Sequence, residues 1–511
     1  MAVRVRGVVT WGITGTMVLL EGRRSESLRP GEILVVGLAG AAVKEGMHRA
    51  RAAVWSLVGE AARSSSHGIL VNLSPADLKK SGRSLDLPLA MVYAAILSDW
   101  KPAAEKGLVF MGEVGLGGEV RPVPGVLAAM PAMREAAVEG LVLPAGNLEE
   151  ARLVEGVELF PVRNVEEAFL ALRGEWPADR GRRGPPQVEG SRKGPDFAQV
   201  RGQFQARRAL EIAAAGGHNV LMDGPPGSGK TMLARRLPTI LPRLSDAEAL
   251  DAARVRSVVR AVDPARIHEP AFRSPHHTAT PAGLAGGGNP IRPGEFSLAH
   301  NGVLFLDEFP EFDRRSLEVL REPLEERVVH ITRAGTALAF PADFLCVAAM
   351  NPCPCGFAGL GDGRCRCTPR RIQHYRGRLS GPLLDRFDLR IFMQPVSARD
   401  LLGDEEGEGS AAIRARVVAA REVQALRYAG EPRPLNGRVS DDAIRRAAHY
   451  GPEERRFLVR MVGLGRLSAR ATRRLERVAR TIADLSGSRE VRKLHLMEAM
   501  GLRLGEALEG E

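Results

Sequence analysis

The stretch Asn219-Val-Leu-Met-Asp-Gly-Pro-Pro-Gly-Ser-Gly-Lys-Thr231 decides the fold of this 511-residue chain. Its second part, residues 224–231, matches the phosphate-binding pattern G-x-x-x-x-G-K-[ST] at every fixed position. The apolar run Asn219–Met222 is typical of a strand, and a helical pattern begins at Lys230. Because such a loop requires this strand–loop–helix order, we expect the segment to bind the phosphates of ATP. The expected nucleotide contacts are Gly224, Pro225, Pro226, Gly227, Ser228, Gly229, Lys230 and Thr231.

The residue types of this loop match the chemistry of a triphosphate. Glycines allow backbone N–H groups to turn toward phosphate oxygens, and the following helix presents the positive end of its dipole. The ammonium of Lys230 supplies a positive charge for the β- and γ-phosphates, and the Thr231 hydroxyl is a ligand for Mg²⁺. ATP and Mg²⁺ are therefore the expected cofactors.

Two later apolar runs end in further polar residues of the expected site. Val303–Leu306 has the continuous apolar character of a buried parallel strand and is followed by Asp307 and Glu308. Ligands bind at the carboxyl ends of parallel strands. We expect Asp307 to hold Mg²⁺ and Glu308 to act as general base toward the attacking water. The amide of Asn351, after the predicted strand Phe344–Ala349, is expected to orient that water.

The chain divides into three blocks and a linker. Residues 1–172 alternate β-like and helical runs, which predicts an α+β domain, and residues 173–195 are rich in Gly, Pro, Arg and Lys, which predicts an exposed linker. Residues 196–395 predict an α/β core, a parallel sheet with helices on both faces. Residues 396–511 predict a helical domain. The expected helices of that domain are Ala411–Tyr428, Asp441–Ala448, Glu453–Val462 and Ala469–Leu485.

The composition limits the classes of partner. Lys and Arg outnumber Asp and Glu by 72 to 61, which gives a net charge of +11. This excess permits binding to nucleic acid or to another acidic surface, and it could equally be a solvated, Arg-rich surface. No apolar run approaches the roughly 18 residues that cross a bilayer. A cytoplasmic protein without membrane contact is therefore expected.

Four of the five cysteines lie close together in the sequence, at Cys353, Cys355, Cys365 and Cys367. This clustering indicates a local site rather than the disulfide framework of a secreted protein. Four thiolates are a ligand set for tetrahedral Zn²⁺. Free or redox-active thiols are the alternative. The fifth cysteine, Cys346, falls in an apolar strand and is expected in the core.

Longer strings around these residues carry a family resemblance. The strings are Ala213-Ala-Ala-Gly-Gly-His-Asn219, Pro275-His-His-Thr278, Pro293-Gly-Glu-Phe-Ser-Leu-Ala-His-Asn-Gly302, Ala348-Ala-Met-Asn-Pro352 and Leu379-Ser-Gly-Pro-Leu-Leu-Asp-Arg-Phe-Asp388. Together with the phosphate loop they resemble the magnesium-chelatase-like AAA+ ATPases, most closely the ComM/YifB group, over nearly the whole chain. The resemblance implies a homo-oligomer, a hexameric ring whose ATP sites are shared between neighbours. In that reading Arg386 resembles the arginine finger and Arg470 the sensor arginine of the helical lid.

The resemblance also implies a partner. ComM-type proteins are implicated in natural transformation, as motors that drive branch migration of DNA. Residues 264–296 and 331–340 resemble an insert and a hairpin that face the central pore in related rings. Contacts to single-stranded or branched DNA should be to phosphates, and hence sequence-tolerant and salt-sensitive. The candidate contacts are Arg292, His330, Arg333 and the pair His276 and His277, which could equally be structural.

The N-terminal block resembles the Lon protease-type domain through the string that runs from Phe110 to Gly125. A Ser–Lys dyad needs both partners in contact to activate the hydroxyl. The region Ser84-Leu-Asp-Leu-Pro-Leu-Ala90 has no serine at the expected point, and Val126-Leu-Ala-Ala-Met-Pro131 lacks the expected lysine. We therefore expect an inactive domain for assembly or DNA contact.

The sequence leaves four functions to compare. A DNA motor is preferred over a chelatase subunit that uses ATP to insert Mg²⁺ into a porphyrin, because the chelatase motor subunit lacks the Lon-type block. The missing dyad disfavours an ATP-dependent protease. The complete set of Asp307, Glu308 and Arg386 disfavours a regulator that only binds ATP.

Overall fold

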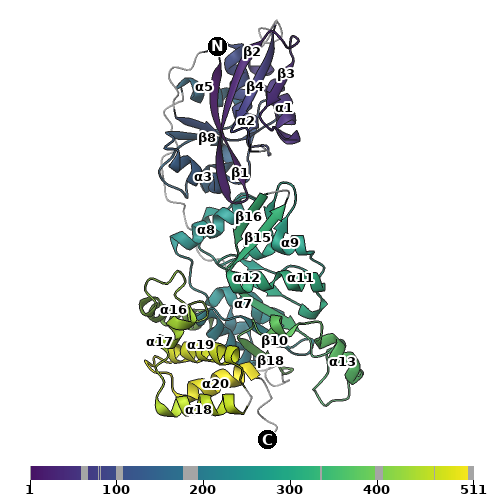
Figure 1. Cartoon of the computed structure of the whole chain (residues 1–511), viewed down its shortest axis with the longest axis vertical. Helices are drawn as coiled ribbons and strands as arrows, with labels where there is room; N and C mark the ends of the chain where they lie inside the picture. The colour runs from purple at the N-terminus through teal and green to yellow at the C-terminus, as the bar shows by residue number, and fades with distance from the viewer. Residues whose placement is uncertain are drawn as a thin grey trace.

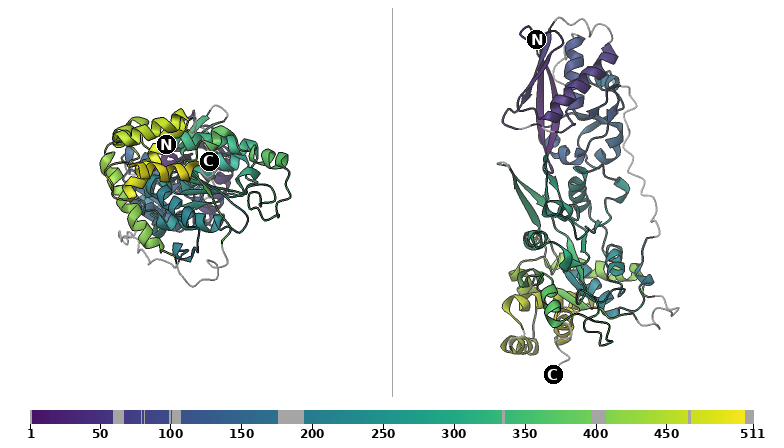
Figure 2. Two further views of the ribbon diagram at one scale, coloured as in Figure 1. Left: turned by 90° about the horizontal axis from the view of Figure 1, so that it is seen from below. Right: turned by 90° about the vertical axis from the view of Figure 1, so that its right-hand side faces the viewer.

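The computed structural model describes residues 2–58, 67–78, 80, 82–98, 100, 107–175, 194–333, 336–396, 407–464 and 467–504. Most of the predicted linker lies outside these ranges. Figure 1 shows an elongated molecule, with a sheet at one end, a second sheet in the middle and helices at the other end. The side view in Figure 2 shows the same order along the long axis.

The N-terminal part is a seven-stranded mixed sheet in the order β3-β4-β2-β1-β5-β8-β9. Its longest pair is the antiparallel hairpin of β1 (Val3–Trp11) and β2 (Thr14–Ser25), which the sequence analysis did not predict. The other strands are β3 (Ile33–Val36), β4 (Gly68–Ser74), β5 (Leu108–Phe110), β8 (Gly140–Pro144) and β9 (Glu158–Val162). The main helices are α1 (Ala41–Val58), α2 (Asp86–Leu97), α3 (Val126–Glu135) and α5 (Val165–Arg173).

The middle part contains a five-stranded parallel sheet in the order β11-β14-β17-β10-β18. The strands are β10 (Val220–Asp223), β11 (Phe272–Arg273), β14 (Val303–Leu306), β17 (Leu345–Met350) and β18 (Leu389–Phe392). Side chains alternate across a strand. Val303 and Phe305 enter one hydrophobic cluster, and Leu304 and Leu306 enter another on the opposite face. Burial on both faces explains why β14 is a continuous apolar run.

Helices cover both faces of this sheet, as predicted. One face carries α6 (Phe204–Gly216) and α7 (Lys230–Ile240). The other carries α11 (Arg314–Val319) and α12 (Arg321–Glu326), from which the hairpin of β15 (Val328–Arg333) and β16 (Thr336–Pro341) extends. That hairpin begins three residues before the segment 331–340 named from the resemblance.

The C-terminal part is helical, which confirms the prediction, and it packs on α6 through α16 and α19. Its helices are α16 (Ser410–Arg427), α17 (Asp441–Ala447), α18 (Pro452–Gly463), α19 (Ala469–Leu485) and α20 (Lys493–Leu504). The last of these was not predicted. No helix in the described ranges has both the length and the apolar character needed to cross a bilayer.

The N-terminal sheet packs directly on the middle part. Helix α8 (Asp246–Ser257) lies against α3, and its Ala249 and Ala253 share one hydrophobic cluster with Val126 and Met130. Two hydrogen bonds cross the same boundary, since the Gly125 N–H donates to the Ser257 carbonyl at 2.7 Å and the Val262 N–H to Glu150 Oε2 at 3.1 Å. The two parts are therefore joined by a common core. The domain boundaries at 172, 195 and 395 stay a prediction.

Candidate ATP site

The loop at residues 224–229 connects the end of β10 to the first turn of α7. Gly227 and Gly229 have φ angles of 77° and 89°. Only glycine adopts this left-handed region without a steric cost, so the loop needs glycine at both positions. This loop leads directly into Lys230, the first residue of α7.

Lys230 joins the loop to a neighbouring strand. Its ammonium is buried and donates to the carbonyl oxygens of Gly224 and Pro225, at 2.5 and 3.0 Å, and to Asn351 Oδ1 at 3.1 Å. Burial lowers the pKa of Lys230, and the nearby carboxylates of Asp307 and Asp223 oppose that shift. The structure thus brings together two residues that lie far apart in the sequence and were predicted for the same site.

A second contact joins α7 to β14. The Thr231 hydroxyl donates to Asp307 Oδ2 at 2.6 Å. A hydroxyl and a carboxylate are oxygen ligands of the kind that Mg²⁺ prefers. Asp307 directly follows β14, and ligands bind at the carboxyl ends of strands in such sheets. The pair therefore fits a magnesium ion.

Glu308 follows Asp307 and has a left-handed backbone, with a φ of 52°. Its carboxylate Oε2 lies 2.9 Å from Nδ1 of His277, and the His277 ring lies 4.2 Å from that of His276. The sequence predicts His277 only as a pore contact or a structural residue, so its contact with Glu308 is a new finding. The contact arises because β11 adjoins β14 in the sheet, and His277 follows β11 as Glu308 follows β14.

Residues that were not predicted for the site also contact the phosphate loop and the strand before it. Arg376, at the end of α13 (Pro369–Arg376), lies 3.8 Å from the Asp223 carboxylate and donates to the Pro352 carbonyl at 3.1 Å. Burial raises the pKa of Asp223. A Cβ at Gly356 would come within 2.5 Å of Pro226 Cδ, so the chain after Asn351 packs on the loop itself.

The two predicted arginines do not reach the loop of their own chain. Arg386 follows α14 (Gly381–Leu384); its guanidinium is buried, forms an ion pair with Glu325 and donates to the Pro382 carbonyl. Arg470 is exposed at the second position of α19 and has no ion pair with any residue that the structure describes. One turn further along α19, Arg474 donates to Asp388 of the core at 3.1 Å.

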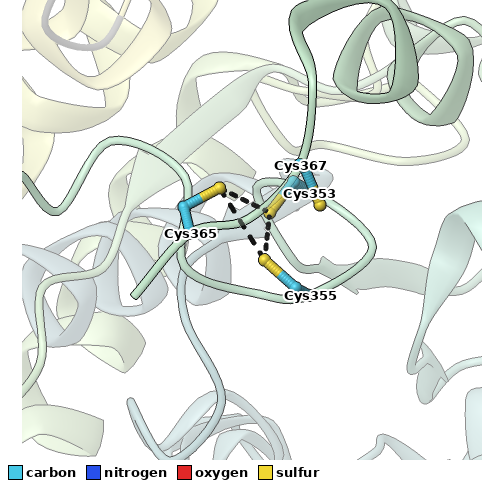
Figure 3. Close-up of side chains that lie close together, drawn as sticks. All are labelled: Cys353, Cys355, Cys365 and Cys367. Atoms are coloured by element: carbon cyan, nitrogen blue, oxygen red, sulfur yellow. Dashed lines mark hydrogen bonds between the residues drawn. The ribbon is translucent and has the colours of Figure 1, made fainter. Parts of the chain in front are cut away.

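The four clustered cysteines come together (Figure 3). The sulfur of Cys353 lies 3.3 Å from that of Cys355 and 3.8 Å from that of Cys365, and all four sulfurs lie within 4.8 Å of one another. A tetrahedral zinc ion with Zn–S bonds of about 2.3 Å separates its ligands by about 3.8 Å. A backbone hydrogen bond at Phe357 lowers the pKa of Cys355 to about 6, whereas burial and contacts with the other thiols raise the pKa of Cys365 and of Cys367. The arrangement fits zinc, and Cys346 is buried in the core as expected.

The segments that resemble the Lon site hold no Ser–Lys pair. The Ser84 hydroxyl donates to the Val8 carbonyl at 3.0 Å. Leu89 in α2 and Leu127 in α3 are fully buried aliphatic residues. These segments form part of the core of the N-terminal sheet.

The parallel sheet and the loop at the end of β10 define a P-loop protein. Residues 196–401 match the family described as magnesium chelatase, subunit ChlI, residues 407–503 its C-terminal family, and residues 24–147 the family described as subunit ChlI of Mg-chelatase. The chain is 40% identical to competence protein ComM of Haemophilus influenzae and 39% identical to YifB of Salmonella typhimurium, with 96% of this chain and 95% of each relative covered. A shorter match, 34% identical over 99 residues, covers 19% of this chain and 11% of DNA replication licensing factor Mcm6 of Drosophila melanogaster.

The family matches and the two full-length relatives show that the chain belongs to the magnesium-chelatase-like AAA+ proteins, in the ComM/YifB group.

Proposed function

We propose that this chain is an ATP-hydrolysing motor that acts on DNA as a hexameric ring, in branch migration or strand separation during natural transformation and recombination. The observation that carries the proposal is the convergence of Lys230, Thr231, Asp307 and Asn351 at one edge of the sheet. A full-length relative is named a competence protein, and a shorter match is named a DNA replication factor. The basic net charge is consistent with a polyanionic partner.

Each residue of the site has a proposed role. Residues 224–231 bind the phosphates, Thr231 and Asp307 hold Mg²⁺, and Lys230 neutralises phosphate charge. Glu308 accepts the proton of the attacking water, and its contact with His277 holds the carboxylate beside the site. The amide of Asn351 orients that water. Bound Mg²⁺ supplies charge neutralisation at the β- and γ-phosphates.

The remaining roles depend on a second subunit or on the other domains. Arg386 and Arg470 have no contact with the loop of their own chain, and we assign them to the ATP site of a neighbour. Residues 1–172 are proposed as an inactive Lon-like domain, 173–195 as a linker, 196–395 as the ATPase core and 396–511 as its helical lid. A cytoplasmic location follows from the proposed work on DNA.

DNA is expected to stimulate the ATPase activity of the full chain. Forked or four-way DNA should raise phosphate release, and the stimulation should fall as salt rises, because phosphate contacts release counterions. Phosphate release measured with and without DNA, over a salt series, tests this. The alternative is a motor subunit of a metal-chelatase-type complex. For such a subunit, the rate of ATP hydrolysis should be the same with and without DNA at every salt concentration.

Zinc is expected to copurify with the untagged chain at about one ion per four-cysteine cluster. Elemental analysis of the purified protein measures this ratio. Cys353→Ser with Cys365→Ser should remove the metal, whereas Cys346→Ala, which changes a cysteine outside the cluster, should retain it. Substoichiometric zinc in the native protein would reject the site and favour free or redox-active thiols.

A further inference from the structure

Helix α13 and the loop before it form a strongly basic surface beside the candidate ATP site. We call residues 362–378 the basic arm. The arm contains six arginines and one histidine but only one acidic residue, Asp362. All seven of these basic side chains are exposed, and α13 lies at the edge of the molecule in Figure 1. They are Arg364, Arg366, Arg370, Arg371, His374, Arg376 and Arg378.

Half of these arginines are already engaged. Arg364 donates to Asp362 at 2.7 Å, Arg378 lies 2.8 Å from the Glu311 carboxylate, and Arg376 contacts Asp223 and Pro352. Arg366, Arg370 and Arg371 form no ion pair with any residue in the described ranges. The arm therefore presents three uncompensated guanidinium groups to solvent.

The base of the arm is fixed to the core. Tyr375 is buried in the hydrophobic cluster on one face of the parallel sheet, and Thr368 caps the start of α13 by accepting from the Arg371 N–H at 3.3 Å. Residues three and four apart share a helix face, so Arg370, Arg371 and His374 lie near one another. Tyr375 therefore fixes α13 on the core, while the side chains of Arg370, Arg371 and His374 remain exposed to solvent.

We propose that the basic arm is a nucleic-acid backbone contact, through which Arg366, Arg370 and Arg371 bind phosphates of the DNA on which the motor acts. The proposal rests on the proposed DNA function. Guanidinium groups match the geometry of phosphate oxygens, and contacts of this kind carry no base sequence information. The arm adds a DNA-binding element outside the pore segments suggested by the resemblance.

The composition of the arm favours nucleic acid over a protein partner. Protein–protein interfaces have a core depleted in charge and enriched in apolar and aromatic side chains. Within residues 362–378 the aromatic residue Tyr375 is buried, and Ile372 is only partly exposed. A surface of one charge sign without an apolar centre is typical of phosphate binding.

The test is a triple variant of the full chain, Arg366→Ala, Arg370→Ala and Arg371→Ala. Fluorescence anisotropy with a labelled single-stranded oligonucleotide should show binding about tenfold or more weaker. The slope of log affinity against log salt should fall by about 2, since each lost phosphate contact removes about 0.7 on single strands. The matched control removes three arginines from exposed positions on α18, Arg455, Arg456 and Arg460. It makes the same change in net charge and should leave the slope unchanged.

The measurements separate a failure of the basic-arm proposal from a failure of the proposed DNA function. Triple replacement by Lys should retain most of the affinity, and nucleotide binding by the Ala variant should match the native chain, which shows that the variant folds. Equal affinity of the Ala variant and the native chain, or an equal loss in the α18 control, overturns the arm proposal alone. Loss of oligomer assembly in the Ala variant assigns the arm to a subunit contact and also overturns it. If the native chain binds no DNA, the proposed function itself fails.

Discussion

Replacement of Glu308 by Gln is expected to stop ATP turnover while ATP binding persists. The amide keeps the size of the side chain but cannot accept a proton, and general base catalysis typically contributes about 10²- to 10⁴-fold to a rate. The contacts that position Lys230 and Thr231 do not involve Glu308, so affinity for nucleotide should remain. Single-turnover phosphate release and fluorescent-nucleotide titration measure the two properties separately.

A matched control is available on the next helix. Glu318→Gln changes an exposed glutamate of α11 that pairs with Arg321 at 2.7 Å, away from the ATP site. This variant should hydrolyse ATP at the native rate. Native turnover by Glu308→Gln would remove Glu308 from the mechanism.

Replacement of Arg386 by Ala is expected to lower ATP turnover by about 10³-fold, the effect typical of a lost arginine finger. The structure shows the Arg386 guanidinium buried and paired with Glu325 of its own chain. That pair must open before the side chain can reach a neighbour's γ-phosphate. Glu325 is mostly exposed and can return to solvent, so the variant should still fold and bind ATP. Steady-state ATPase and nucleotide-binding assays test this.

Mixing subunits separates an action on a neighbour from a purely internal role. Chains with Arg386→Ala retain Glu308, and chains with Glu308→Gln retain Arg386. A mixed ring therefore contains some interfaces with both residues intact, and mixing should restore part of the activity of two inactive proteins. No restoration, in rings shown by sedimentation to be mixed, would contradict an action of Arg386 across the interface.

The sequence predicts most residues of the candidate site because its signals are local. The spacing within residues 224–231 and the strand before it specify a phosphate loop without reference to the rest of the chain. The apolar run Val303–Leu306 likewise identifies a buried strand and hence the position of Asp307. The lid helices α16 and α19 were predicted within a residue of their ends, because helical periodicity is also a property of neighbouring residues.

Other features could not be predicted because they depend on register and packing between distant segments. The partner of Glu308 is a histidine from the loop after β11, and nothing in either local pattern requires that β11 adjoin β14. The contact of Gly356 with Pro226 depends on how the cysteine loop folds back. The hairpin of β1 and β2, in contrast, has a local signal that was missed, since apolar and charged residues alternate in Val3-Arg-Val-Arg6 and Gly12 lies in the turn.

The amino-acid order alone determined that this chain has a phosphate loop, a parallel sheet to carry it and a helical C-terminal part. These properties follow from spacing and hydrophobic periodicity over a few residues. Only the tertiary structure decided which side chains meet: Lys230 with Asn351, Glu308 with His277, and α3 with α8. Such contacts join segments separated by tens to hundreds of residues, and packing of the whole core selects them.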